Sequence, residues 1–94
     1  MIRRDFGPMT QEELMAIAES STATREEQFP EVGWDRTHVK LHDNGAWTTY
    51  CIYDAPHIDA IRRYSAATNM PIDEEVEIAM DFVAGDPLPI GAGD

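Results

Sequence analysis

The chain contains a single cysteine, Cys51, and few basic residues, and both shortages exclude classes of function. One cysteine cannot form an internal disulfide, so Cys51 is a small buried residue, a metal ligand or a reactive thiol. Seven lysines and arginines stand against 18 aspartates and glutamates, which gives a formal net charge of -11. Such a charge repels nucleic acids and anionic membranes and attracts cations. We therefore expect no nucleic-acid partner and no membrane partner.

Long hydrophobic runs are also absent, since none approaches the ~20 residues that cross a bilayer. Residues 1–5 include two arginines with no apolar stretch after them, so we expect no signal peptide and a cytoplasmic location. The 94 residues fit one domain with a small core, which we place at residues 1–84. Residues 85–94 are rich in glycine and proline, and we expect them to form a flexible acidic tail.

Hydrophobic periodicity predicts two helices and four strands. Thr10 and Glu13 form a capping box, which predicts a helix from there to about residue 28. The predicted strands cover residues 1–6, 34–42, 46–53 and 76–82, and the second predicted helix follows Pro56. The order strand, helix, strand, strand, helix, strand is that of a ferredoxin-like α+β domain with a four-stranded antiparallel sheet. Both helices should then cover one face of the sheet and leave the other face open.

The dipeptide Asn44-Gly45 lies between the two middle strands and is a strong hairpin signal. A two-residue loop at these positions places His38 opposite Cys51 and brings His42 onto the same face. With this register, the open face of the sheet carries seven residues: Trp34, Arg36, His38, His42, Trp47, Cys51 and Tyr53. Because two tryptophans and a tyrosine are too apolar to remain in water, we expect a homodimer through this face.

The same constellation predicts a site. An imidazole and a thiolate in opposed positions can share a divalent metal such as nickel or zinc, so His38 and Cys51, with His42 as a third ligand, form a candidate metal site. The residues that would wall a ligand pocket beside it are Trp34, Arg36, Trp47 and Tyr53. The leading interpretation is a small protein that binds a metal ion or another small ligand.

Two alternatives remain open from the residues alone. Dimeric α+β barrels run oxygenase, isomerase or cyclase chemistry on small hydrophobic substrates, and here Arg36, His38 and Tyr53 would polarise or deprotonate the substrate. A thiolate–imidazolium nucleophile formed by Cys51 and His38 is disfavoured by its position in the middle of a strand. The third interpretation is a scaffold whose pocket is only its dimer interface.

The string Tyr-Cys-Ile-Tyr-Asp-Ala-Pro at residues 50–56, followed by Ala-Ile-Arg at residues 60–62, resembles a small bacterial family of unknown function, DUF4242. The likeness extends over residues 1–83 and includes Arg-Asp-Phe at residues 4–6 and Asn-Met-Pro at residues 69–71. It implies a ferredoxin-like dimer and, because one member is described as nickel-binding, a divalent cation. Arg36 and Tyr64 stand at positions where the family often has histidine, so only Cys51 carries over as a candidate ligand.

Overall fold

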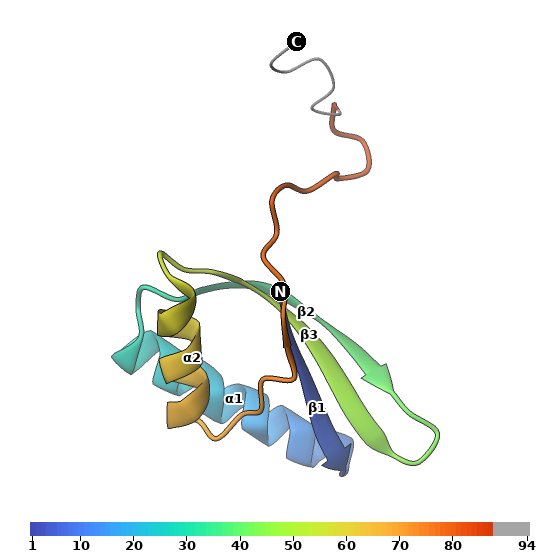
Figure 1. Cartoon of the computed structure of the whole chain (residues 1–94). Coiled ribbons are helices and arrows are strands. Elements are labelled where there is room, and N and C mark those ends of the chain that lie inside the picture. Colours follow the sequence, from blue (N-terminus) through green and yellow to red (C-terminus); the bar gives the residue numbers. More distant parts are fainter. Residues whose placement is uncertain (88–94) are drawn as a thin grey trace.

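The computed structural model describes residues 1–87, so residues 88–94 of the predicted tail lie outside the described part of the chain. The elements follow in the order β1 (Ile2–Pro8), α1 (Gln11–Gln28), β2 (Gly33–Leu41), β3 (Ala46–Asp54), α2 (Ile58–Ala67) and β4 (Glu74–Glu75). The strands form one antiparallel sheet in the spatial order β2-β3-β1-β4, and both helices lie on one side of it (Figure 1). The predicted ferredoxin-like α+β fold is confirmed. Within residues 1–87, no helix is both long and apolar enough to cross a bilayer.

Helix α1 begins as the sequence predicts. The Thr10 hydroxyl accepts the Glu13 backbone N–H at 3.1 Å, and the Glu13 carboxylate accepts the Thr10 backbone N–H at 3.1 Å. This reciprocal pair satisfies two of the four N–H groups that a helix start leaves without partners. On the inward side of α1, Leu14 and Ser21 are buried.

The core lies between the sheet and helix α2. Its buried cluster consists of Ile2, Val32, Ala60, Ile61 and Tyr64. Ile2 lies on β1 and Val32 directly precedes β2. The other three residues lie on α2, whose apolar stripe therefore faces the sheet. The cluster is small, as expected for a chain of this length.

A hydrogen bond between His42 and Ala46 closes the β2–β3 hairpin, so three residues, 43–45, form the loop inside it, where the sequence predicted two. The Gly45 N–H donates to the His42 carbonyl, and the His42 N–H donates to the Ala46 carbonyl. Gly45 has a φ of 84°, whereas Asn44 is not among the residues with positive φ. A type I′ turn needs positive φ at both central residues, so this loop is instead a turn followed by a left-handed glycine.

The extra loop residue shifts the hairpin register by one position. Thr37 pairs with Cys51, and His38 pairs with Tyr50. The predicted pairing of His38 with Cys51 is therefore wrong. Because side chains alternate between faces along a strand, a shift of one residue places these two side chains on opposite sides of the sheet.

The shift, together with a β-bulge between Trp34 and Arg36, divides the seven residues that were expected to share the open face. Those on the helix side of the sheet are Trp34, Trp47, Cys51 and Tyr53, and those on the open side are Arg36, His38 and His42. All three aromatic residues thus leave the open face, which removes the apolar surface on which the prediction of a dimer through that face depended.

The final strand differs from the prediction in both position and length, because no residue of the predicted range 76–82 is in a strand. Strand β4 consists of Glu74–Glu75, whereas the sequence predicted residues 76–82. Val76 exchanges two backbone hydrogen bonds with Met1. Because β4 runs antiparallel to β1, the residues that follow Val76 pass beyond the N-terminal end of β1 and have no strand beside them there. They lead away from the sheet and the helices as an extended segment (Figure 1).

Candidate functional site

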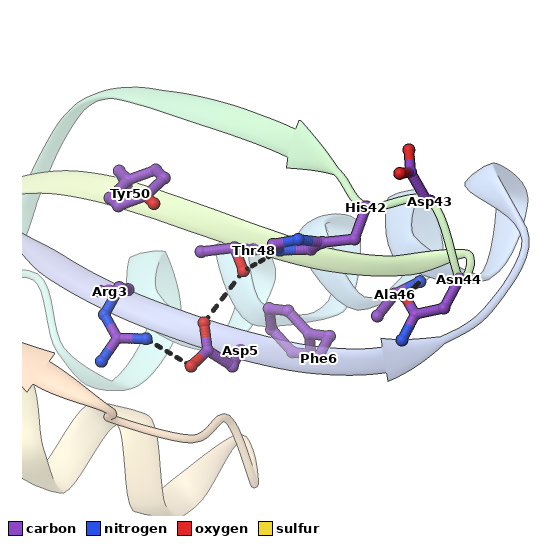
Figure 2. Close-up of a pocket in the computed structure, with 9 residues that line it drawn as sticks. All are labelled: Arg3, Asp5, Phe6, His42, Asp43, Asn44, Ala46, Thr48 and Tyr50. Carbon is purple, nitrogen blue, oxygen red and sulfur yellow. Dashed lines mark hydrogen bonds and ion pairs between the residues drawn. The ribbon is translucent and has the colours of Figure 1, made fainter.

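The open face of the sheet carries a shallow hollow of about 510 Å³ beside the β2–β3 loop (Figure 2). Its lining comes from β1, from β3 and from the loop. The lining residues are Arg3, Asp5, Phe6, His42, Asp43, Asn44, Ala46, Thr48 and Tyr50. Most of these side chains are polar or charged, and they include the imidazole of His42 and the carboxylates of Asp5 and Asp43.

Three side chains in the hollow form a continuous hydrogen-bonded chain (Figure 2). The His42 Nε2 lies 2.7 Å from the Thr48 Oγ1, and the Thr48 hydroxyl donates to the Asp5 Oδ1 at 2.9 Å. The other carboxylate oxygen of Asp5 accepts the Arg3 guanidinium in an ion pair. A hydroxyl, a carboxylate and a guanidinium therefore follow the His42 Nε2 atom, each bonded to the next. This chain fixes the orientation of the imidazole.

Strand pairing brings these side chains together. Asp5 of β1 is paired directly with Thr48 of β3, and Lys40 of β2 is paired with Thr48 on its other side. His42 follows the end of β2 and is two residues from Lys40, so it lies on the same face as Thr48. Thr48 is only 4 % exposed, which keeps its hydroxyl in this arrangement.

The direction of the hydrogen bonds determines which ring nitrogen of a neutral His42 carries the proton. The Thr48 hydroxyl has one hydrogen and gives it to Asp5, so its oxygen must accept a hydrogen from the His42 Nε2. A neutral His42 then carries its proton on Nε2 and has a free lone pair on Nδ1. Nδ1 is therefore the atom with which His42 could accept a proton or bind a metal ion.

The electrostatics of the hollow agree with this assignment. The hydrogen bond from Thr48 lowers the pKa of the Asp5 carboxyl below its ordinary value of 3.8, and the hydrogen bond from Arg3 lowers it further. Asp5 is therefore ionised at neutral pH and acts only as an acceptor.

We expect Asp5 to contribute stability in a defined pH range. Since its pKa in the folded state lies below that in the unfolded state, its contribution is fully present above an ordinary aspartate pKa and is lost as the pH falls through the folded-state pKa. The Asp5→Asn variant should therefore show a flatter dependence of the thermal midpoint on pH below about pH 4. Glu19→Gln removes an exposed carboxylate from α1 and is the matched control. An equally flat profile in that control would contradict a special role for Asp5.

Cys51 lies apart from this hollow. It is 7 % exposed on the helix side of the sheet, and its thiol donates to the Thr49 Oγ1 at 3.7 Å. His38 is exposed on the open side, two residue positions beyond Lys40 from His42. Four residues along a strand span about 13 Å, which is too far for His38 and His42 of one copy to bind the same ion. The structure therefore brings no two of the three predicted ligands together.

The four predicted pocket residues are also separated from the hollow. The Trp34 Nε1–H donates to the Thr37 Oγ1, the Trp47 Nε1–H to the Met9 carbonyl, and the Arg36 Nε–H to the Asp35 carboxylate. The bonds of Trp34 and Arg36 stay within β2, whereas the bond of Trp47 links β3 to the residue that follows β1.

Tyr53 packs against the core cluster, and burial raises the pKa of its phenol above the ordinary value. The phenol consequently stays protonated at neutral pH. A protonated phenol cannot deprotonate a substrate, which was one of the two roles that the enzyme interpretation gave to Arg36, His38 and Tyr53 together.

The donors in residues 1–87 do not make up a complete metal shell. In this part of the chain, no three His, Cys, Asp or Glu side chains are placed to hold one ion. The hollow offers one oriented imidazole with carboxylates nearby, and nickel accepts such nitrogen and oxygen donors. Any further ligands would have to be water or another molecule.

Sequence reasoning did not identify Asp5 and Thr48 as part of a site. Their functional arrangement depends on the pairing of β1 with β3, which join residues more than 40 positions apart. No local motif marks these residues. The resemblance had included Asp5 within the string Arg-Asp-Phe, and this was the only signal near it.

Comparison with known proteins adds a family to this description. No curated protein and no solved structure is similar enough to match the chain. Residues 1–78 match the family described as nickel responsive protein SCO4226-like. The match bears out a resemblance to a nickel-associated family, although not the narrower label DUF4242. Since it covers most of the 94 residues, the chain belongs to the SCO4226-like family of nickel-responsive proteins.

Proposed function

We propose that this protein binds nickel or a similar divalent cation in the hollow on the open sheet face, with the Nδ1 atom of His42 as its principal ligand. The observation that supports this most directly is the chain of hydrogen bonds from His42 through Thr48 to Asp5. Membership of a nickel-responsive family supports the class of ligand.

The arrangement around His42 resembles the surroundings of metal-binding histidines in general. Such histidines donate their second ring N–H to a carboxylate, a carbonyl or a water, which fixes the ring and raises its basicity. Here the Thr48 hydroxyl accepts a hydrogen bond from the His42 Nε2–H and donates one to the Asp5 carboxylate. Arg3 neutralises part of the charge on Asp5, so the carboxylate stays in place without an ion.

The remaining ligands are oxygen donors. Asp43 lines the same hollow as His42, and water can complete the coordination because the hollow is open to solvent. Nickel accepts imidazole and oxygen donors together. The net charge of -11 raises the local concentration of cations around the molecule.

Nickel titration followed by calorimetry tests this proposal. We expect His42→Ala to weaken nickel binding by at least about tenfold, since it removes the principal ligand, and Asp5→Asn to weaken it by about tenfold through the orientation of His42. His57→Ala is the matched control, because His57 is an exposed histidine before α2 and lies outside the hollow. Its affinity for nickel should equal that of the unmodified protein.

A further variant separates this proposal from the pairing that the sequence suggested. Cys51→Ala should bind nickel as tightly as the unmodified protein, because the thiol faces the helices. Nickel affinity that depends on Cys51 and not on His42 would contradict the proposal. So would an unmodified protein that takes up no nickel.

A further inference from the structure

A second cavity, of about 600 Å³, lies where β3 leads into α2. Its walls come from the start of β1, the end of β3, the first turns of α2, and β4 with the residues that follow it. Space is left here because Ile2, the first residue of β1, is paired with Cys51, so the last residues of β3 continue past β1. None of the residues that line this cavity lines the hollow around His42. The cavity therefore stands apart from the nickel proposal.

The buried part of the cavity wall is apolar. Ile2 is 1 % exposed and Ile61 is 8 % exposed, and Tyr53 packs against the core cluster to which both belong. Ile58 and Val76 also line the cavity and are each 39 % exposed, so apolar surface continues outward to the solvent. A ligand that fits this wall needs an apolar body.

The Tyr53 hydroxyl has a hydrogen that no group in residues 1–87 accepts. The Arg4 Nη2 donates to the Tyr53 hydroxyl oxygen at 3.2 Å, and a guanidinium can only donate, so the direction of this bond is fixed. The hydrogen of the hydroxyl is then left to donate elsewhere. Burial raises the pKa of the phenol, so this hydrogen is present at neutral pH. Tyr53 is consequently a donor that is available to a ligand with an acceptor.

The guanidinium behind Tyr53 strengthens this donor. Arg4 is buried, its Nε has no hydrogen-bond partner, and no carboxylate is paired with it within residues 1–87. A hydrogen bond from a cation polarises the hydroxyl that accepts it, and each bond in such a chain strengthens the next. The buried positive charge also favours partial negative charge on an oxygen atom beside Tyr53.

The charges around the cavity disfavour an anionic ligand. The carboxylates of Asp54, Glu75 and Glu77 line it, against the guanidinium of Arg62 and the amino group of Met1. Arg62 is paired with Glu75 at 2.7 Å, and the chain as a whole has a formal net charge of -11. Carboxylates and phosphates are therefore repelled. The acceptor that fits is an uncharged oxygen.

We propose that this cavity binds a small neutral carbonyl compound. Its apolar body lies against Ile2 and Ile61, and its carbonyl oxygen accepts the hydrogen of the Tyr53 hydroxyl, with Arg4 behind the phenol. This arrangement uses the apolar wall, the available hydrogen and the uncompensated buried charge together. It gives Tyr53 the role of a hydrogen-bond donor, which suits its protonated state.

Nuclear magnetic resonance with acetophenone, isotopically labelled at its carbonyl carbon, tests the proposal on the full chain with a chelator present. A pH of about 8 keeps an ordinary histidine such as His57 neutral. We expect saturable binding and a downfield shift of the carbonyl resonance, since a hydrogen bond draws electron density from that carbon. Ethylbenzene, which has the same ring and no oxygen, is the reference ligand.

The Tyr53→Phe variant separates the hydrogen bond from the apolar contact. It should bind acetophenone about tenfold more weakly and lose the downfield shift, while its affinity for ethylbenzene should not fall. The side chain of Arg4 keeps its bonds to Ser65 and Pro71 in this variant, which supports folding. Tyr50→Phe removes a hydroxyl from the open face and is the matched control, with no change for either ligand.

A second variant tests the cavity without altering Tyr53 or Arg4. Ile58→Trp places a larger side chain at the partly exposed rim and should weaken the binding of both ligands by at least about tenfold, because it fills the space that they occupy. Benzoate and benzylamine test the charge of the ligand, since each has the ring of acetophenone with a negative or a positive group. Both should bind more weakly than the ketone.

Three results would overturn the proposal. The first is no saturable binding of acetophenone at about 5 mM, which exceeds the dissociation constants expected for specific ligands of this size and would leave the cavity to water. The second is an unchanged affinity and an unchanged carbonyl shift in Tyr53→Phe. The third is tighter binding of benzoate or benzylamine than of acetophenone.

Discussion

Replacing Arg4 with alanine should lower the free energy of unfolding by about 3 kcal/mol. Arg4 is 1 % exposed on the helix side of β1. Its guanidinium donates to the Pro71 carbonyl at 2.8 Å, to the Ser65 Oγ at 2.9 Å and to the Tyr53 hydroxyl at 3.2 Å. It therefore joins β1 to α2, to β3 and to the loop that precedes β4.

The size of this effect follows from two opposed terms. Each hydrogen bond from a charged donor contributes about 1.5–3 kcal/mol, and the variant leaves buried acceptors without a donor. Against this stands the cost of burying a charge, since Arg4 has no carboxylate partner within residues 1–87 and its Nε has no hydrogen-bond partner there. We expect the three bonds and the packing of the side chain to outweigh that cost.

Urea unfolding followed by circular dichroism measures the difference. Arg4→Lys keeps the charge but not the planar fork, so it should recover only part of the loss. Arg4→Met keeps most of the volume without the charge. If Arg4→Met were as stable as the unmodified protein, the three hydrogen bonds would be doing no more than offsetting the burial of the charge, and the expectation would be wrong.

Replacing Tyr64 with alanine should lower the free energy of unfolding by about 3–5 kcal/mol, which is a large part of the stability of a domain of this size. Tyr64 is 2 % exposed on α2, and its ring lies 5.9 Å from the rings of both Phe29 and Tyr53. The variant removes the largest apolar side chain of the core cluster and leaves a cavity between α2 and the sheet.

Tyr50→Ala is the matched control for this second effect. Tyr50 is a half-buried tyrosine on the open face of the same sheet and takes no part in the core cluster. The same change of side chain there should cost less stability, because part of the Tyr50 side chain is already in contact with water. Thermal unfolding of the two variants at one protein concentration makes the comparison. Equal losses would show that the core cluster is not the main source of stability.

Local patterns predicted the elements well. The capping box at Thr10 and the periodicity of the two middle strands and of α2 all depend on neighbouring residues, and the structure contains the cap and each of these elements. The order of these elements was sufficient to predict the ferredoxin-like fold, because few topologies connect them without crossing. The last strand was an exception, since alternation alone does not show whether a partner strand lies beside it.

The candidate site could not be predicted to the same extent. His42 was recognised as a potential ligand, and the structure adds a fixed ring and a free Nδ1 atom. Its supports, Asp5 and Thr48, come from strands that pair over a long sequence distance. The pairing of His38 with Cys51 failed because two-residue and three-residue loops are both compatible with Asn44-Gly45.

By itself, the sequence determined the two helices, the first three strands, the order of the elements and the acidic character of the surface. Those properties follow from the spacing of side chains and the sum of charges, which do not depend on distant contacts. Only the tertiary structure decided which side chains share a face, because one additional residue in a loop turns every side chain of a strand to the other side of the sheet. For this protein, that single residue placed Cys51 beneath the helices and left His42 on the open face beside Thr48.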